Sequence, residues 1–479
     1  MAADRAAQAG PGRAGPGRSG SRPLYAEIAD PGSLTRFGEE IEPANPSDWP
    51  GYPDQLRRAQ NATGARHAVT TAMATVGGEA CVLAGFEFPF LGGSMGTAEG
   101  ARIARAFSVA VAERLPIVCV SASGGSRMQE GTSALLQMQA VAAAIAGARR
   151  AGIPHVAVAG DPTTGGVWSS LIADADVLIS VPGARVSFSG SRTRPAGADP
   201  RSPEYLADGK WAHGFIDVLS PEPELRTEVA VAVRLLSPRS RGDTPDRAPL
   251  PPWPAQDVGG PPGADAWTHV SRARSPRRAR ADRWLAAYFG QTIEIRGDRC
   301  GGVDPGLRCG FGRRQGATIA YVAQTGERTT PAGFRTATRL LGLAARFRLP
   351  VLTLIDTPGA AAAPADEAAG VGPAIAELFV AMASSQVPVT SVVIGEGVSG
   401  GALALASPDD LWIARDAYLA VTAPELASSI LKLGVRDIPQ VATWLRLTPA
   451  ELMSRGIVRG IIGESTSIAG QVASGPDPR

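Results

Sequence analysis

Glycine-rich turns recur in both halves of this chain, and each stands between an apolar, strand-like run and an Ala-rich, helix-like run. In the first half they are LGGSMG (91–96), SASGGSRM (121–128) and DPTTGGV (161–167), and in the second half they are DTPGA (356–360) and GEGVSGGAL (395–403). Such turns aim backbone N–H groups at a bound oxygen atom. Two sets in one chain predict two oxyanion sites, and therefore transfer of a group between two carbonyl-type substrates.

The order of these runs predicts an α/β fold that occurs twice. Residues 24–236 alternate β-branched runs with helical ones, and residues 265–479 repeat the order of strand, glycine-rich turn and helix. This alternation is typical of α/β domains. We therefore predict two related α/β domains in tandem, a duplication whose period is a whole domain. The Gly/Pro/Arg-rich residues 1–23 predict a flexible tail, and the Pro-rich residues 237–264 predict a linker.

Composition excludes several classes of function. The chain has 479 residues, of which 44% are hydrophobic, and a net charge of +2 gives no reason to expect nucleic acid as a partner. No apolar stretch is long enough to span a membrane, and no secretory signal is evident, so we expect a cytoplasmic protein with reduced thiols. The cysteines form no CxxC pair, so no metal site is expected; they are Cys81, Cys119, Cys300 and Cys309.

The glycines also have a purely structural interpretation, because glycine permits tight turns and close helix packing. A Rossmann fingerprint requires G-x-G-x-x-G, and neither SGGSRM nor TTGGVW has that spacing. Two glycine pairs follow successive strands of one domain, Gly124–Gly125 and Gly165–Gly166. Their N–H groups are expected to converge on one point, which favours an enolate or thioester oxyanion as the ligand.

Side chains with acid–base chemistry are scarce near these turns. The four histidines belong to no motif with a serine and an acidic partner; they are His67, His155, His213 and His269. His155, next to Pro154 at the start of a strand, is better explained as a packing residue. The sequence therefore favours oxyanion stabilisation together with a reactive cofactor.

Charged residues flank several turns. Arg127 directly follows SGGS, and we predict that it contacts the phosphates of a nucleotide-like group. Arg102 and Arg105 are expected on a solvated helix face. Asp356 and Glu396 each end a strand before a glycine turn, where capping of the following helix and an active-site role both stay open.

Together these motifs resemble the carboxyltransferase component of biotin-dependent acetyl-CoA carboxylase. The first half is similar to its beta subunit through DPGSLTRFGEEIEP, FPFLGGSMGTAEG, SASGGSRMQEG and DPTTGGV, and the second half is similar to its alpha subunit through WTHVSRAR, RGDR, FRTATRL, LTLIDTPGA and IGEGVSGGALAL. The resemblance covers nearly the whole chain after the tail. It implies a beta–alpha fusion made of two crotonase-like (ClpP/crotonase superfamily) spiral α/β domains in tandem, the first binding acyl-CoA and the second binding biotin.

The resemblance also implies a mechanism. Carboxybiotin on a carrier protein releases CO₂, the biotin left behind acts as base on acetyl-CoA, and the acetyl-CoA enolate attacks CO₂ to give malonyl-CoA for fatty acid or polyketide synthesis. It implies two oxyanion sites: Gly165 and Gly166, assisted by Gly124 and Gly125, for the thioester oxygen, and Gly400 and Gly401 for the biotin ureido oxygen. Further substrate-binding residues are Gly93 and Arg127 in the first half and Gly359 and Ala360 in the second. A homodimer, a biotin carboxyl carrier protein and a biotin carboxylase are the implied partners.

The chain departs from the family pattern in three respects: the start of the first half, one segment later in that half, and two segments of the second half. The four-cysteine zinc ribbon that usually begins the beta subunit is missing, so no zinc is expected. FSGSR (188–192) replaces FAGPR, and the segments QTGERTTPAGFRTA (324–337) and AAAPADEAAG (361–370) are altered. Two alternatives stay open beside acetyl-CoA carboxylation: a carboxylase or decarboxylase for another short acyl-CoA, and a non-catalytic paralogue in a carboxylase complex.

Overall fold

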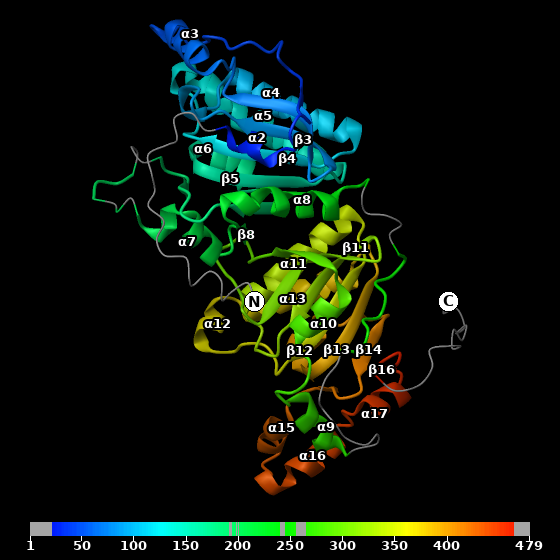
Figure 1. Cartoon of the computed structure of the whole chain (residues 1–479). Coiled ribbons are helices and arrows are strands. Elements are labelled where there is room, and N and C mark those ends of the chain that lie inside the picture. The colour runs from blue at the N-terminus through cyan, green and yellow to red at the C-terminus, as the bar shows by residue number, and fades with distance from the viewer. Residues whose placement is uncertain are drawn as a thin grey trace.

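The computed structural model describes residues 22–190, 194–197, 199, 201–239, 245–254 and 265–463. Two eight-stranded sheets follow one another along the chain and lie one beyond the other in an elongated molecule (Figure 1). The predicted tail lies almost entirely outside the described residues, and the predicted linker lies partly outside them. Within the described residues, no helix combines the length and the apolar character needed to cross a membrane.

The first sheet has the order β1-β2-β3-β4-β5-β6-β8, with β7 beside β5. Its strands are β1 (Thr35–Arg36), β2 (Val69–Val76), β3 (Glu79–Phe86), β4 (Ile117–Ser123), β5 (His155–Thr164), β6 (Val177–Ser180), β7 (Val186–Ser187) and β8 (Val218–Leu219). Strands β2 and β3 form an antiparallel hairpin through Gly77 and Gly78, whose φ angles of 57° and 80° suit a tight hairpin turn. From β3 to β8 the pairs are parallel, so helices must connect them.

The second sheet has the order β9-β10-β11-β12-β13-β14-β16, with β15 beside β13. Its strands are β9 (Gln291–Ile295), β10 (Leu307–Arg314), β11 (Ala317–Gln324), β12 (Val351–Thr357), β13 (Val389–Val398), β14 (Leu411–Ala414), β15 (Tyr418–Ala420) and β16 (Ile461–Ile462). Three antiparallel strands are again followed by parallel ones, so this sheet repeats the topology of the first strand for strand.

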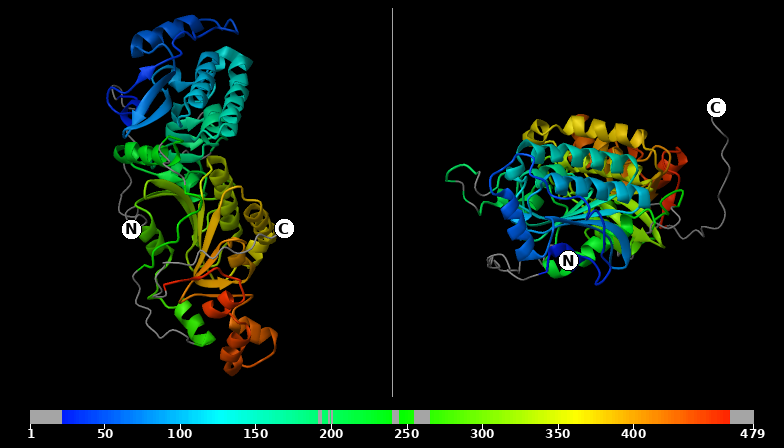
Figure 2. Two further views of the ribbon diagram at one scale, coloured as in Figure 1. Left: turned by 90° about the vertical axis from the view of Figure 1, so that its right-hand side faces the viewer. Right: turned by 90° about the horizontal axis from the view of Figure 1, so that it is seen from above.

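Helices connect the parallel strands in both halves, and further helices precede or follow the sheets. Those of the first half are α2 (Leu24–Ile28), α3 (Tyr52–Thr63), α4 (Thr97–Glu113), α5 (Gly131–Arg150), α6 (Gly165–Val167), α7 (Ala207–Ala212) and α8 (Leu225–Leu236). In the second half they are α9 (Ala266–Ala273), α10 (Ala281–Tyr288), α11 (Pro331–Phe347), α12 (Pro364–Ala368), α13 (Val371–Ala383), α14 (Ser399–Leu403), α15 (Pro424–Ile430), α16 (Ile438–Trp444) and α17 (Pro449–Ser454). The pairs α4–α5 and α11–α13 lie on the same side of the molecule (Figure 2).

The duplication can be followed residue by residue at the turns. The register between β4 and β5 shifts after Ser121, and the register between β12 and β13 shifts after Ile355. The first paired residues beyond each shift are Ser123 with Thr163, and Thr357 with Gly397. Thr163 of the first half therefore matches Gly397 of the second, and two residues further along Gly165 matches Ser399. The glycine pairs 165–166 and 400–401 are thus offset by one residue. Gly166 matches Gly400, and Gly401 matches Val167.

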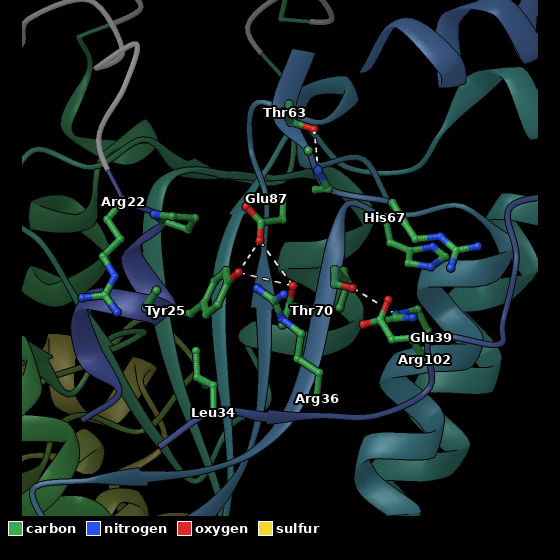
Figure 3. Close-up of a pocket in the computed structure, with 16 residues that line it drawn as sticks. Arg22, Tyr25, Leu34, Arg36, Glu39, Thr63, His67, Thr70, Glu87 and Arg102 are labelled. Atoms are coloured by element: carbon green, nitrogen blue, oxygen red, sulfur yellow. Dashed lines mark hydrogen bonds and ion pairs between the residues drawn. The ribbon is translucent and has the colours of Figure 1, made fainter. Parts of the chain in front are cut away.

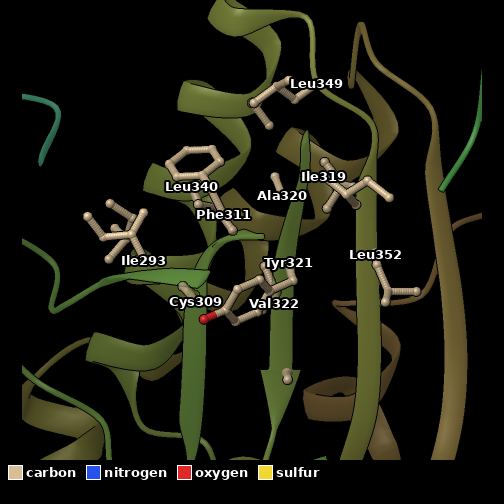
Figure 4. Packing of buried hydrophobic residues seen from close by; sticks show 14 of the residues in the cluster. Ile293, Cys309, Phe311, Ile319, Ala320, Tyr321, Val322, Leu340, Leu349 and Leu352 are labelled. Carbon is tan, nitrogen blue, oxygen red and sulfur yellow. The ribbon is translucent and has the colours of Figure 1, made fainter. Parts of the chain in front are cut away.

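One hydrophobic core joins the two halves. A continuous cluster of buried residues includes Leu83 and Val158 of the first sheet and Phe311 and Leu352 of the second. Helix α8, from the end of the first half, packs on strands of both sheets and connects the two parts of this cluster. Figure 4 shows the second-half part, where Phe311 lies beside Leu340 of α11. The predicted domain limits stay a prediction, because packing continues across them.

Buried ion pairs also link the halves. Asp217, directly before β8, accepts hydrogen bonds from Arg299 (2.6 Å) and Arg339 (3.2 Å) of the second half. Its carboxylate is fully buried. Because a buried carboxylate needs partners to offset its lost hydration, the second half is required to complete the environment of a first-half residue.

Candidate active site

The turns that follow β4 and β5 approach each other at the carboxyl ends of these strands. A Cβ atom on Gly125 would lie 3.4 Å from the Cα of Gly165 and 3.6 Å from the amide nitrogen of Gly166. Gly125 has a φ of +107° and Gly165 a φ of +61°, both in the region that favours glycine. The two turns therefore converge, as their glycine pattern predicts, and their contact depends on residues without side chains.

Most of the predicted N–H donors in the first half already have a partner within the protein. The amide of Gly124 donates to the Gly92 carbonyl (2.9 Å), and the amide of Gly165 donates to the Phe188 carbonyl (3.1 Å). The amide of Gly125 donates to the Ser123 hydroxyl (3.1 Å). Among the described hydrogen bonds, none engages the amide of Gly166. Of the four predicted donors, Gly166 is thus the one that can bind a ligand without breaking an internal bond.

A second unengaged amide belongs to Ser126, which the sequence by itself indicates only as a turn-forming residue. Met95 pairs with Ser126 in an isolated parallel bridge, which uses the Gly125 carbonyl and the Arg127 amide and leaves the Ser126 amide without a partner in the described structure. A Cβ atom on Gly166 would lie 2.7 Å from the Ser126 hydroxyl, so the two residues are neighbours. Ser126 corresponds in the duplication to Ala360, through the matching bridge of Ala360 with Thr329.

Gly93 holds the first glycine-rich loop against β4. Its φ is +61°, and a Cβ atom there would lie only 2.1 Å from the carbonyl oxygen of Ala122. Its carbonyl accepts a hydrogen bond from the Ser123 hydroxyl (2.6 Å), and its amide donates to the Phe90 carbonyl (2.9 Å). Gly93 therefore allows close backbone packing beneath the site, and its N–H group is already used.

The structure corrects the interpretation of Arg127 as a phosphate ligand. Its side chain is completely buried and forms ion pairs with Glu99 (2.9 Å) and Glu130 (3.3 Å), which are buried as well. Burial alone would lower the pKa of Arg127, but Glu99 and Tyr52 raise it above its ordinary value. Arg127 cannot reach a phosphate in solvent, and it instead ties the 124–131 turn to α4.

Glu99 and Glu130 complete this buried cluster. The Glu130 carboxylate accepts hydrogen bonds from the Tyr52 hydroxyl (2.6 Å) and the Thr97 amide (2.6 Å). Glu99 accepts bonds from the amides of Gly96 (3.0 Å) and Ala68 (3.1 Å). The cluster joins segments that are far apart in the sequence, so no short motif reveals it. Arg102, expected on a solvated face, is likewise buried and donates to the Val69 carbonyl (3.0 Å).

The second set of turns repeats this arrangement after β12 and β13. Gly359 has a positive φ of +123°, and its first-half counterpart Gly125 also has a positive φ, of +107°. A Cβ atom on Gly401 would lie 2.5 Å from the amide nitrogen of Ala360. The amides of Ala360 and Gly400 have no partner among the described hydrogen bonds. A Cβ atom on Gly400 would meet no atom within 4 Å, so the space in front of this residue is open. Gly401 is instead the close-packing glycine of the pair.

Two polar side chains beside the second turns were not predicted. Gln324 is fully buried at the end of β11 and donates to the Gly401 carbonyl (3.0 Å) and to the Thr329 hydroxyl (3.0 Å), which holds α14 in place. Arg328 is exposed, and its Nη1 donates to the Ala360 carbonyl (3.2 Å). That nitrogen would lie 3.7 Å from a Cβ atom placed on Gly359. Arg328 thus brings a positive charge to the open side of these turns.

Asp356 and Glu396 do not cap helices. Asp356 is fully buried and pairs with Arg278 (2.5 Å), and it also accepts a bond from the Glu396 amide (3.1 Å). Glu396 pairs with Arg274 (2.8 Å) and accepts a hydrogen bond from the Tyr418 hydroxyl (2.7 Å). Both carboxylates are held in ion pairs beneath the second turns, where they support the position of the backbone.

His155 is a packing residue, as expected. It is buried in β5 and its ring meets that of Phe107 edge to face at 5.2 Å. Desolvation by burial, with a smaller effect from Arg149, lowers the pKa of its imidazole to about 3. A histidine that stays neutral and enclosed in this way is unsuited to acid–base catalysis near neutral pH.

A cavity of about 450 Å³ lies beside the N-terminal segment, away from the predicted residues. Tyr25, Thr70 and Glu87 line one wall, where the Tyr25 hydroxyl donates to Glu87 (Figure 3). Burial, together with the hydrogen bond to Glu87, raises the pKa of Tyr25 to about 12. None of the predicted site residues lines this cavity.

Comparison with known proteins agrees with this geometry. Residues 42–194 match the family model described as carboxyl transferase domain, and residues 263–474 match the model described as acetyl co-enzyme A carboxylase carboxyltransferase-like. The transcarboxylase 12S structure aligns with a TM-score of 0.73 at 20% identity, covering 92% of this chain and 85% of that one. The fold is therefore that of carboxyltransferases with two crotonase-like domains in tandem, as predicted.

Relatives define the family more narrowly. The acetyl-coenzyme A carboxylase carboxyl transferase subunits beta/alpha of Salinispora tropica are 38% identical over 93% of this chain and 82% of the relative. Those of Saccharopolyspora erythraea are 36% identical over 93% of this chain and 80% of the relative. A probable biotin-dependent acyl-coenzyme A carboxylase beta3 subunit of Mycobacterium bovis is 32% identical over 92% and 88%. The chain belongs to the acetyl-CoA carboxylase carboxyltransferase family in its fused beta/alpha form.

Proposed function

We propose that this chain transfers a carboxyl group from carboxybiotin, carried on a separate protein, to acetyl-CoA, giving malonyl-CoA. The observation that carries the proposal is the pair of matching sites: the unengaged amides of Ser126 and Gly166 in the first half, and those of Ala360 and Gly400 in the second. A reaction between two carbonyl-type substrates needs two such sites. Family membership supports the assignment of these substrates.

Each pair of amides has a distinct task in the proposed reaction. Carboxybiotin supplies CO₂ and, after its release, the base. The amides of Ser126 and Gly166 bind the thioester oxygen and stabilise its negative charge as the α-carbon of acetyl-CoA loses a proton. The amides of Ala360 and Gly400 bind the ureido oxygen, where negative charge develops as CO₂ leaves. Gly401 and Gly359 keep the second turns close enough for both amides to face one oxygen.

The reverse reaction tests the proposal directly. Purified protein incubated with malonyl-CoA and biocytin is expected to form acetyl-CoA and CO₂ at a rate that depends on biocytin, as measured by a coupled citrate synthase assay. Turnover of malonyl-CoA without biocytin would identify a simple decarboxylase. Absence of turnover with malonyl-CoA and methylmalonyl-CoA, with or without biocytin, would favour the non-catalytic alternative. A faster reaction with methylmalonyl-CoA would replace acetyl-CoA by propionyl-CoA as the acceptor.

A homodimer is the second part of the proposal. Large apolar side chains are exposed in both halves: Met128, Leu135, Leu136 and Phe188 in the first, and Val380, Leu403, Val421, Leu426 and Ile430 in the second. Exposed apolar side chains that gather on one face mark interaction surfaces. In a twofold dimer the first-half surface of one copy covers the second-half surface of the other, which brings one site of each kind together.

Light scattering during gel filtration is expected to give twice the chain mass of 49.3 kDa. Leu135→Asp should convert the dimer to monomer and remove the biocytin-dependent activity with it, because a charge is placed in the apolar contact. Trp49→Asp, at another exposed apolar residue of the first half, serves as the control and should leave both unchanged. An active monomer would refute the dimeric site. The proposed reaction implies two protein partners, a biotin carboxyl carrier protein and a biotin carboxylase. It also implies a cytoplasmic location and a place in fatty acid or polyketide synthesis.

A further inference from the structure

Ser399 has a left-handed backbone conformation, with a positive φ, and the corresponding residue of the first half in the same conformation is a glycine. Its φ is +64°, and Gly165, which corresponds to it in the duplication, has a φ of +61°. A side chain in this conformation is disfavoured by contact between Cβ and the backbone. Such a residue persists where its side chain has a use that offsets the strain, and for this reason an observed outlier is a legitimate basis for a functional hypothesis.

Space explains why the two halves differ. A Cβ atom on Gly165 would lie 3.3 Å from the Cα of Gly125, so the first turn has little room for a side chain. The second turn has room beside Ser399, although Gly401 of the same helix packs closely on this turn. The only described atoms within 4 Å of a Cβ atom placed on Gly359 would be Arg328 Nη1 at 3.7 Å and the Val398 carbonyl oxygen at 3.8 Å. A hydroxyl group can therefore be accommodated in the second site and not in the first.

The hydroxyl of Ser399 makes no hydrogen bond to any residue that the structure describes. Serines in turns and short helices usually bond back to the nearby backbone. Ser170, in the first-half segment that follows Gly166, does so by donating to the Gly166 carbonyl (2.6 Å). Ser399 is exposed, and no hydrogen bond of the described residues involves its side chain. Its donor and acceptor capacity is thus available to a ligand.

The sequence around Ser399 carries a signal that the glycine pattern obscured. Residues 397–401 read G-V-S-G-G, which has the G-x-S-x-G spacing of a strained strand-to-helix turn. In such a turn the serine Oγ projects from the end of the strand, beside the amide of the residue that follows, here Gly400. In hydrolases with this turn a histidine activates the serine. None of the described contacts brings a histidine to Ser399, so its hydroxyl is a hydrogen-bond donor here.

We propose that Ser399 contacts substrate in the second site, donating a hydrogen bond from its hydroxyl to an oxygen of the carboxylated ureido group. This inference rests on the proposed function. The hydroxyl adds a side-chain donor to the amides of Ala360 and Gly400, and Arg328 adds a positive charge on the same open side. The first site, with Gly165 in this place, has only backbone donors. The two halves are thereby specialised for different oxygens.

The test compares stability with activity in Ser399→Gly and Ser399→Ala. Glycine relieves the strained conformation, so we expect Ser399→Gly to melt at the same temperature or about 1–2 °C higher than the wild type. The same variant should lose about tenfold in kcat/KM for biocytin in malonyl-CoA decarboxylation, because one hydrogen bond is missing. KM for malonyl-CoA should stay unchanged. Ser399→Ala should lose the same activity without any gain in stability.

Arg114→Gly and Arg348→Gly are matched controls. These exposed residues end α4 and α11 with φ angles of 54° and 55°, so glycine relieves the same strain there. Both controls should gain stability and keep full activity. Activity of Ser399→Gly equal to that of the wild type would overturn the inference while leaving the proposed function intact. A wild-type protein without biocytin-dependent turnover would overturn both. Labelling of Ser399 by a fluorophosphonate would instead identify a nucleophile and overturn the role as a donor.

Discussion

Replacing Gly166 with valine should lower the rate of biocytin-dependent acetyl-CoA formation on the order of 10²-fold or more. The amide of Gly166 is the unengaged donor of its glycine pair, and even a Cβ atom would lie 2.7 Å from the Ser126 hydroxyl and 3.0 Å from the Met138 sulfur. The branched side chain must therefore displace the neighbouring turn and fill the space in front of the amide. Gly401→Val should have an effect of the same order on the second site, because its Cβ atom would press on the Ala360 amide at 2.5 Å.

Steady-state kinetics with malonyl-CoA and biocytin distinguishes these effects from general damage. Gly342→Val is the control, since Gly342 lies within α11 and a Cβ atom there meets nothing within 4 Å. It should retain activity near that of the wild type. Circular dichroism should show that Gly166→Val stays folded. A folded Gly166→Val variant with normal kcat/KM would refute the assignment of this amide to the thioester oxygen.

Replacing Arg127 with methionine should destabilise the protein by about 3–5 kcal/mol, because it leaves buried carboxylates without their positive partner. Glu99 and Glu130 are both fully buried, and Arg127 lies 2.9 Å and 3.3 Å from them. Methionine resembles arginine in length and fills much of the same volume, so the loss arises chiefly from the missing charge. Urea denaturation monitored by fluorescence measures the change in the free energy of unfolding.

Arg185→Met provides the matched control. Arg185 pairs with Asp161 at 2.7 Å, but both side chains are about half exposed (48% and 49%). Water replaces the lost partner there, so the free energy of unfolding should change by about 1 kcal/mol or less. If Arg127 contacted the phosphates of CoA, its replacement would instead raise KM for malonyl-CoA and leave the unfolding transition in place. That outcome would restore the interpretation drawn from the sequence.

The glycine turns could be located from the sequence because their main signals are local. A strand, a glycine-rich turn and a helix occupy about twenty to forty consecutive residues, and their hydrophobic pattern and glycines are visible without any structure. The correspondence of Gly359 with Gly125, both at positive φ, shows that the duplicated turns were correctly recognised. From the sequence, Ser126 is interpreted only as a turn residue, because serine beside glycine is typical of an ordinary turn.

Local pattern alone thus determined that this chain forms two related α/β domains with glycine turns at their strand ends. The tertiary structure decided which amides stay unengaged, that Arg127 is enclosed between Glu99 and Glu130, and that Ser399 stands where the first half has Gly165. The physical reason is that hydrogen bonding and burial depend on partners distant in the chain. The amide of Gly165 is occupied by the Phe188 carbonyl, which only the folded backbone brings to it.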